Sequence, residues 1–203
     1  GTVTLSGANT YTGITNVTNG VLLLSGANTL KSAVNVTGGT LKIGNSDALR
    51  GAPVVNVSGG GTFDANGIGV GTRYAEIAFS GAGVGGNGAI VNNGVGITNN
   101  SHFAKYTMTG DATWGGSGRY DLVAGQTFNG GSFTLTKVGA GELWYNPNAG
   151  SILENVVVNG GFFGSQGNNP LSATATVTVN NGGTHQFYSA ITGQHKVVLN
   201  DGG

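Results

Sequence analysis

The chain has 203 residues, a formal net charge of zero, 41 Gly and only 3 Pro. Charged residues make up 8% of it, against about 25% in an average protein, whereas 38% of the residues are hydrophobic. This composition excludes collagen and a disordered chain dominated by charge. It also disfavours a helical bundle, because each helical Gly costs about 1 kcal/mol.

A short phrase recurs along the chain: alternating valines, a Gly or Asn corner, then an apolar or Thr position. It occupies residues 16–22, 34–41 and 55–63, and it returns at 156–163 and 177–185. The alternation predicts short strands that point Val inward and Asn, Thr or Ser outward, while Gly and Asn supply the positive φ that tight corners need. Asn and Thr at equivalent positions are also expected to stack into side-chain ladders.

The spacing of these phrases predicts the architecture. Their second valines are 19, 21, 101 and 21 residues apart, and the long gap is close to five periods of about 20. A repeat of this length with one supersecondary unit is typical of a solenoid. We therefore predict an all-β fold, a right-handed parallel β-helix (β-solenoid) with about 20 residues per coil and roughly ten coils.

A longer repeat lies over the short one. Residues 34–63 match residues 156–185 without a gap, at an offset of 122. This alignment predicts one inward column of valines and a second inward column of larger residues. The first column is expected to hold Val17, Val36, Val57, Val158 and Val179, and the second Leu22, Leu41, Phe63 and Phe163.

The repeats predict one domain, a single β-solenoid segment over residues 1–203, with repeat copies at about 1–65 and 135–187. Nothing in it resembles the polar cap that closes natural solenoids, and residues 200–203 form a turn signal with no strand after it. We expect a part of a longer protein or filament, whose partners are other copies in head-to-tail stacking or flanking repeats of the same chain.

Residues that could carry chemistry form no pattern typical of a site. Most of the acids do not share a column at a 20-residue period: Asp111 and Asp121 lie half a coil apart, and Asp47 belongs to a turn-like stretch. The Gly-rich residues 81–88 lack the Lys-Ser/Thr of a phosphate loop and predict a corner or loop. The histidines are not at the spacing of metal ligands: His102, His185 and His195. We predict no catalytic, cofactor-binding or metal-binding residue, no cofactor and no enzyme activity.

Aromatic residues concentrate in the middle and later part of the chain and leave two interpretations open. They fill the interior or cover an end, or they form an outward face for sugar rings or a neighbouring subunit. The candidates for such an exposed interaction surface are Trp114, Tyr120, Trp144 and Tyr145.

Three segments resemble parts of known bacterial surface proteins. Residues 1–13, Gly-Thr-Val-Thr-Leu-Ser-Gly-Ala-Asn-Thr-Tyr-Thr-Gly, resemble the passenger-associated transport repeat of autotransporters, and residues 135–143 resemble the lead-in to the same motif. Residues 109–120 are similar to a segment of large surface proteins with autotransporter-associated β-strand repeats. The resemblance implies a right-handed parallel β-helix on a secreted or surface-anchored bacterial protein, and it implies no activity.

The function expected from these observations is structural: an extracellular or cell-surface segment that forms a stalk, fibre or scaffold and stacks end to end. The alternatives are a carbohydrate-binding or adhesive module with surface polysaccharide as its partner and, less favoured, a polysaccharide-degrading enzyme. Scattered basic residues and zero net charge argue against nucleic acid. No apolar run approaches the ~20 residues of a membrane span, so no membrane insertion is expected, and the absence of Cys excludes disulfides.

Overall fold

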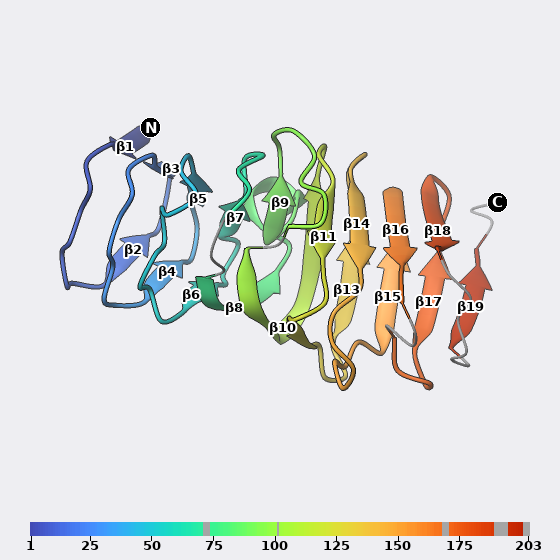
Figure 1. Ribbon diagram of the computed structural model, residues 1–203. Helices are drawn as coiled ribbons and strands as arrows, with labels where there is room; N and C mark the ends of the chain where they lie inside the picture. Colours follow the sequence, from blue (N-terminus) through green and yellow to red (C-terminus); the bar gives the residue numbers. More distant parts are fainter. Residues whose placement is uncertain (71–73, 101, 168–170, 189–194, 201–203) are drawn as a thin grey trace.

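The fold is an all-β solenoid of parallel strands, with about eight turns of roughly 22 residues each (Figure 1). The computed structural model describes residues 1–70, 74–100, 102–167, 171–188 and 195–200. The predicted parallel β-helix is confirmed, but its turns are fewer and longer than the expected ten coils of 20. The middle turns account for this: 27 residues separate Phe63 from its register partner Ile90, against 19 between Leu22 and Leu41.

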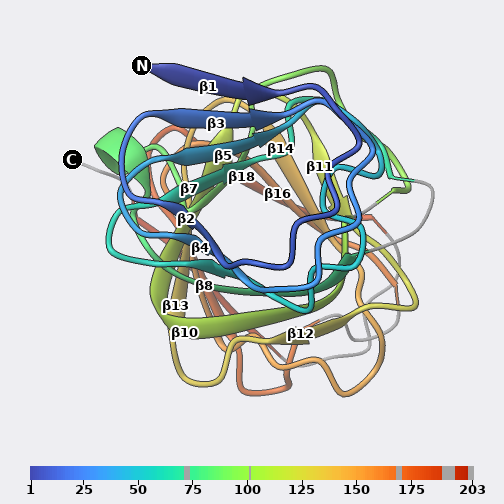
Figure 2. The same ribbon diagram turned by 90° about the vertical axis from the view of Figure 1, so that its left-hand side faces the viewer.

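The strands form three faces around the solenoid axis (Figure 2), and every pairing between described strands is parallel. The first face holds β1 (Thr2–Leu5), β3 (Val21–Leu24), β5 (Thr40–Ile43), β7 (Thr62–Asp64), β9 (Ile90–Asn92), the end of β10 (Phe103–Gly116), β13 (Thr134–Lys137), β15 (Asn155–Val158), β17 (Thr176–Val179) and β19 (Lys196–Leu199). The second holds β2 (Thr15–Val17), β4 (Val34–Val36), β6 (Val55–Val57), β8 (Tyr74–Gly81), the start of β10 and β12 (Thr127–Asn129). The third holds β11 (Tyr120–Leu122), β14 (Glu142–Tyr145), β16 (Gly161–Ser165) and β18 (Gly183–Phe187).

Helix is almost absent, as the Gly content predicts. The described residues contain one short 3-10 segment, η1 (Val84–Gly86), within the Gly-rich stretch 81–88 that was expected to be a corner or loop. None of the described residues belongs to a helix long and apolar enough to cross a membrane.

Tight corners between the faces depend on glycine. Gly20 stands at the corner between β2 and β3 with a φ of 68°, in the left-handed region that favours glycine. A Cβ on Gly20 would lie 2.5 Å from the carbonyl oxygen of Gly1 in the preceding turn. The corner residue must therefore be small because successive corners stack directly on one another.

The long strand β10 joins two faces and changes the phase of the repeat. Its residues 105–107 pair with β8 and β12 on the second face, whereas its residues 112–114 pair with β13 on the first, and the register shifts between Met108 and Ala112. Before β10 the recurrent phrase turns from the second face onto the first, as in β4 and β5. After β10 the same phrase turns from the first face onto the third, as in β15 and β16.

Because of this phase change, the two predicted inward columns are wrong: each combines residues that belong to different columns of the structure. Val158 lies in the column of the large residues, and Phe163 lies in neither predicted column because β16 belongs to the third face. The second-face column runs Val17, Val36, Val57, Phe79 and Met108. The first-face column runs Val3, Leu22, Leu41, Phe63, Ile90, Trp114, Lys137, Val158, Val179 and Leu199. The third-face column runs Tyr120, Leu143, Phe163 and His185.

The predicted side-chain ladders are present as two runs of asparagine. In the first, Asn35 Nδ2 donates to Asn16 Oδ1 at 3.0 Å, and Asn56 Nδ2 donates to Asn35 Oδ1 at 2.9 Å. In the second, the same bonds join three further residues at 2.6 and 3.0 Å: Asn159, Asn180 and Asn200. Each of these bonds runs from an amide to the turn before it, so the ladders connect successive turns on the outside of the solenoid.

Candidate functional site

The four aromatic candidates do not form an exposed surface, because each is at most 8% exposed. Trp114 and Tyr120 lie in inward columns with their ring centroids 5.0 Å apart, and Tyr145 packs against Phe128 at 5.3 Å. These rings fill the interior of the wide middle turns. The expectation of an outward aromatic face is thus corrected in favour of the interior interpretation.

Tyr120 also belongs to a buried polar network. Burial lowers the pKa of His102 to about 4, so the ring is neutral at pH 7. Its Nε2 donates to the carbonyl of Ile68 at 2.7 Å, which leaves Nδ1 to accept from the hydroxyl of Tyr120 at 2.8 Å. The hydroxyl of Tyr106 lies 2.8 Å from that of Tyr120. All three side chains are buried, so the network joins segments of three turns and does not meet solvent.

Trp144 differs from the other three candidates because it lies on the outer side of the third face. Its ring lies against Gly164 of the next strand, where a Cβ would collide with it. The Arg119 guanidinium carbon lies 4.9 Å above the ring, and Trp144 Nε1 donates to Glu142 Oε2 at 2.8 Å. Tyr188 packs edge-on against the ring at 5.5 Å. The surrounding side chains therefore seal Trp144 from solvent.

Arg119 is held in place over Trp144 by a carboxylate. Its Nε and Nη2 donate to the two oxygens of Asp121 at 2.7 and 2.9 Å, and this hydrogen bonding raises the pKa of Arg119 further above its ordinary value. Asp121 is itself buried and also accepts from the backbone N–H of Asn99 at 2.7 Å. Both oxygens of the Asp121 carboxylate are therefore hydrogen-bonded within the protein and hold Arg119 in place. The exposed aromatic of this area is Tyr188, which no recurrent phrase singled out.

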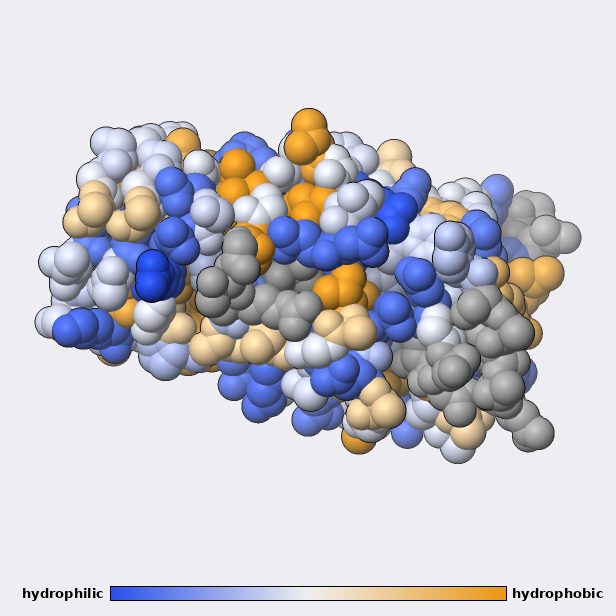
Figure 3. All heavy atoms as spheres, in the orientation of Figure 1, coloured by the Kyte–Doolittle hydropathy of each residue, from blue (hydrophilic) through white to orange (hydrophobic). Residues whose placement is uncertain are grey.

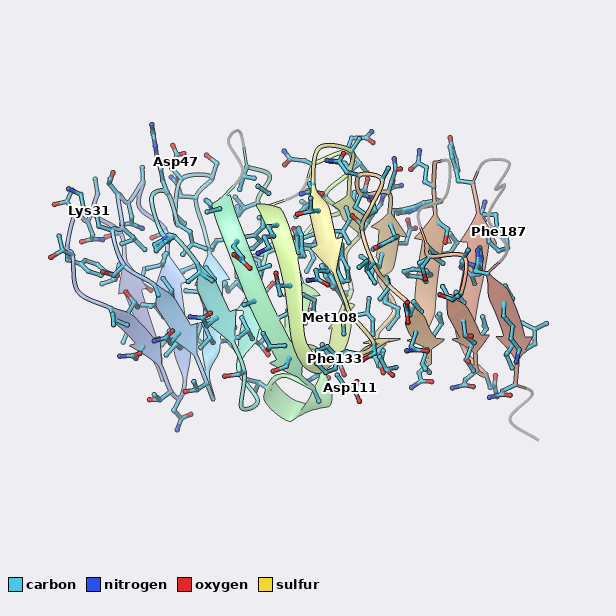
Figure 4. The ribbon with its side chains drawn as sticks, turned by 90° about the horizontal axis from the view of Figure 1, so that it is seen from below. Lys31, Asp47, Met108, Asp111, Phe133 and Phe187 are labelled. Carbon is cyan, nitrogen blue, oxygen red and sulfur yellow. The ribbon has the colours of Figure 1, made fainter. Side chains whose placement is uncertain are left out.

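The remaining acids of the described residues are not gathered on one face of the solenoid. Asp111 lies beside Phe133 on one side of the solenoid and accepts from the backbone N–H of Thr134 at 2.8 Å, whereas Asp47 lies on another side (Figure 4). Asp47 stands in a turn, as expected, and its carbonyl accepts from the N–H of Arg50 at 3.2 Å. The residues that the structure describes contain no group of three or more His, Asp or Glu that could hold a metal ion.

The two ends of the solenoid expose residues that belong to the interior. Val3 and Leu199 are the outermost members of the first-face column, and they are 59% and 78% exposed, whereas members between them such as Leu41 and Phe63 are buried. Val197 at the second end is also exposed, although its register partner Val177 is buried. Phe187 lies at the end that carries β18 and β19 (Figure 4), where apolar atoms reach the surface (Figure 3). These end surfaces are the candidate functional sites.

Comparison of the chain with protein-family models, with curated proteins and with solved structures finds no match. The resemblance to autotransporter repeats and the surface location that it implies therefore stay predictions. What the chain does has to be argued from its geometry.

Proposed function

We propose that the chain is a structural β-solenoid segment of a surface stalk or fibre, whose ends are extended by head-to-tail pairing with further copies. The observation that carries this proposal is the exposure of Val3 and Leu199 at opposite ends of one otherwise buried column. Apolar side chains in this arrangement gain about 25 cal/mol per Å² of apolar surface when another turn covers them.

The strands at the two ends are built alike. Stacking β1 on β19 so that the first-face column continues places Val3 over Leu199, because both side chains point inward on strands of four residues. β1 and β2 carry no charged residue, whereas natural edge strands commonly use charge to prevent pairing. A contact between opposite ends is heterologous, so it propagates as a filament and does not close as a dimer.

The test blocks each end in turn. Val3→Lys places a charge on the first end and Leu199→Lys places one on the other, and Val95→Lys is the matched control because Val95 is 75% exposed away from both ends. We expect filaments of the parent and of the control in electron microscopy and light scattering. Each end variant alone should remain monomeric, and an equimolar mixture of the two should form dimers through the remaining pair of unaltered ends.

If the parent chain stays monomeric at high concentration, head-to-tail pairing of copies is overturned. Flanking repeats of the same polypeptide would then be the partners that cover the two ends. Assembly of both end variants to the same extent as the parent also overturns head-to-tail pairing, because the contact would then lie elsewhere. Dimers from the mixture alone support the proposal most directly, since no side-by-side contact predicts them.

A further inference from the structure

A groove of about 480 Å³ lies on the outer side of the first face, along β1, β3, β5, β7 and β9. Its floor consists of side chains that alternate with the inward column. Val21 and Leu23 of β3 supply an aliphatic strip, and Thr40 and Lys42 of β5 follow them in register. The volume falls within the range of small-ligand sites, roughly 300–1,000 Å³.

One wall of the groove is a loop fixed to the floor through a single hydroxyl. Thr62 Oγ1 of β7 accepts from the N–H of Val84 at 2.8 Å and donates to the carbonyl of Gly88 at 2.9 Å. Both contacts hold the loop that carries η1, which projects sideways from the solenoid (Figure 2). Val84 and Asn87 of this loop line the groove. The concavity is therefore built into the fold, because Thr62 itself is buried.

Of the two charged groups in the floor, Asp64 is hydrogen-bonded within the protein, whereas Lys42 keeps donors for a ligand. Asp64 is buried, and its carboxylate accepts from the backbone N–H groups of Asn66 and Asn93 at 2.9 and 3.2 Å. The Lys42 ammonium lies 3.8 Å from Asp64, beyond hydrogen-bond distance, and its side chain is 34% exposed. The ammonium is thus charge-compensated while its N–H donors remain available to a ligand.

We propose that this groove binds a neutral, hydroxyl-rich chain, namely an oligosaccharide. Aliphatic side chains suit the C–H surface of a sugar, and the hydroxyl of Thr40 and the ammonium of Lys42 offer hydrogen bonds to its hydroxyls. The pairing of Lys42 with Asp64 leaves no net charge to select an ion. Five strands spaced by about 4.8 Å give the groove a length of about 19 Å, which suits an oligomer.

An extended peptide fits this groove less well. Peptides that add to a sheet pair with a free strand edge. The floor is instead the face of a sheet whose strands β3, β5 and β7 already pair on both sides. Recognition in the groove has to come from side chains, as it does for a sugar chain.

The experiment titrates the full chain with neutral hexasaccharides (cellohexaose, mannohexaose and N-acetylchitohexaose) and with the anionic hexagalacturonate, by calorimetry and NMR. We expect at least one neutral hexasaccharide to bind. Thr40→Arg, which fills the floor, should weaken it at least about tenfold, and Lys42→Met should weaken it by about tenfold. Thr178→Arg is the matched control, an outward threonine of the same face beyond the groove, and it should leave the affinity unchanged.

Absence of binding by every neutral hexasaccharide at millimolar concentration overturns the proposal, and so does binding of hexagalacturonate alone. Binding that Thr40→Arg and Thr178→Arg weaken equally places the ligand elsewhere and overturns the assignment of the groove. The end variants Val3→Lys and Leu199→Lys do not bear on this inference, which is independent of head-to-tail pairing.

Discussion

Lys137 occupies an inward position on the first face, where its register partners are Trp114 and Val158. Its side chain is buried, and the ammonium donates to the carbonyls of Val138, Gly139 and Gly160 at 2.7, 3.2 and 3.4 Å. The three N–H donors therefore meet three corner carbonyls. The charge has no carboxylate partner in the contacts of the described residues, so its burial is only partly offset.

Burial lowers the pKa of Lys137 from an ordinary 10.5 to about 8. Because the folded pKa is the lower one, the unfolded chain binds the proton more tightly. The stability contributed by the neutral amine is present above about pH 10.5 and is lost as the pH falls to about 8, at about 1.4 kcal/mol per pKa unit.

We expect Lys137→Met to abolish this pH dependence. Urea unfolding at pH 7.5 and pH 10 should show the parent gaining stability relative to Lys137→Met as the pH rises. Lys31→Met, at an exposed lysine, should follow the parent at both values. An identical pH response of parent and Lys137→Met would show that Lys137 keeps its ordinary pKa.

At the scale of the strand, the fold depends on which side chains point inward. Val57 of β6 is buried in the second-face column, whereas Val157 of β15 points outward between buried Val156 and Val158. Both are valines on short parallel strands, so a comparison of the two isolates the effect of direction. An unpaired charge in an apolar column costs several kcal/mol.

We therefore expect Val57→Asp to lower the free energy of unfolding by several kcal/mol, or to prevent folding. Val157→Asp should cost about 1 kcal/mol or less, which is the range of strand propensity at a solvated position. Circular dichroism and urea unfolding measure both. Equal destabilisation by the two substitutions would contradict the register of either β6 or β15.

The sequence predicts individual strands better than their assignment to faces. Alternating valines mark β4, β6, β15 and β17, because strand period and burial act within three or four residues. The long strand β10 escapes prediction, since it has no corner where one face ends and the next begins. If β10 is not anticipated, the constant offset of 122 residues suggests that the two copies of the phrase occupy the same faces. In the structure, the phrase turns from the second face onto the first before β10 and from the first onto the third after it.

Functional surfaces are harder still to predict from the sequence. The groove collects Thr40, Thr62 and Val84 from separate turns, and no local motif connects them. His102 and Tyr120 are 18 residues apart, yet they meet in the interior only because the middle turns are wide. The inward or outward direction of Trp114 depends on its place in β10, which the phrases do not specify.

At the scale of the whole molecule, each turn contacts mainly the turns before and after it, and stability is then approximately a sum over neighbouring turns. Val36 and Val57 are register partners, so residues 37–57 make up one complete turn. Their removal joins two equivalent positions of the second face. Removal of residues 37–47 alone would instead join positions on different sides of the solenoid.

We expect the chain without residues 37–57 to keep its β circular dichroism and to unfold cooperatively with reduced stability. The chain without residues 37–47 should lose that signal, because the strands after the deletion no longer meet their partners in register. Unfolding of both deletions to the same extent would argue against turns that act as independent units.

The asparagine ladders give the molecule a direction. The four bonds of the ladders all run in one direction, from an amide donor to the turn nearer the first end, so their dipoles add along the axis in the way that peptide dipoles add along an α-helix. Asn16 is the ladder residue nearest the first end, and its side-chain amide donates to no residue that the structure describes. Asn200 is the ladder residue nearest the other end, and its side-chain oxygen accepts from no further member of the ladder. A fibre in which such units pair head to tail is polar, because its two tips differ, and growth at the two tips should proceed at different rates.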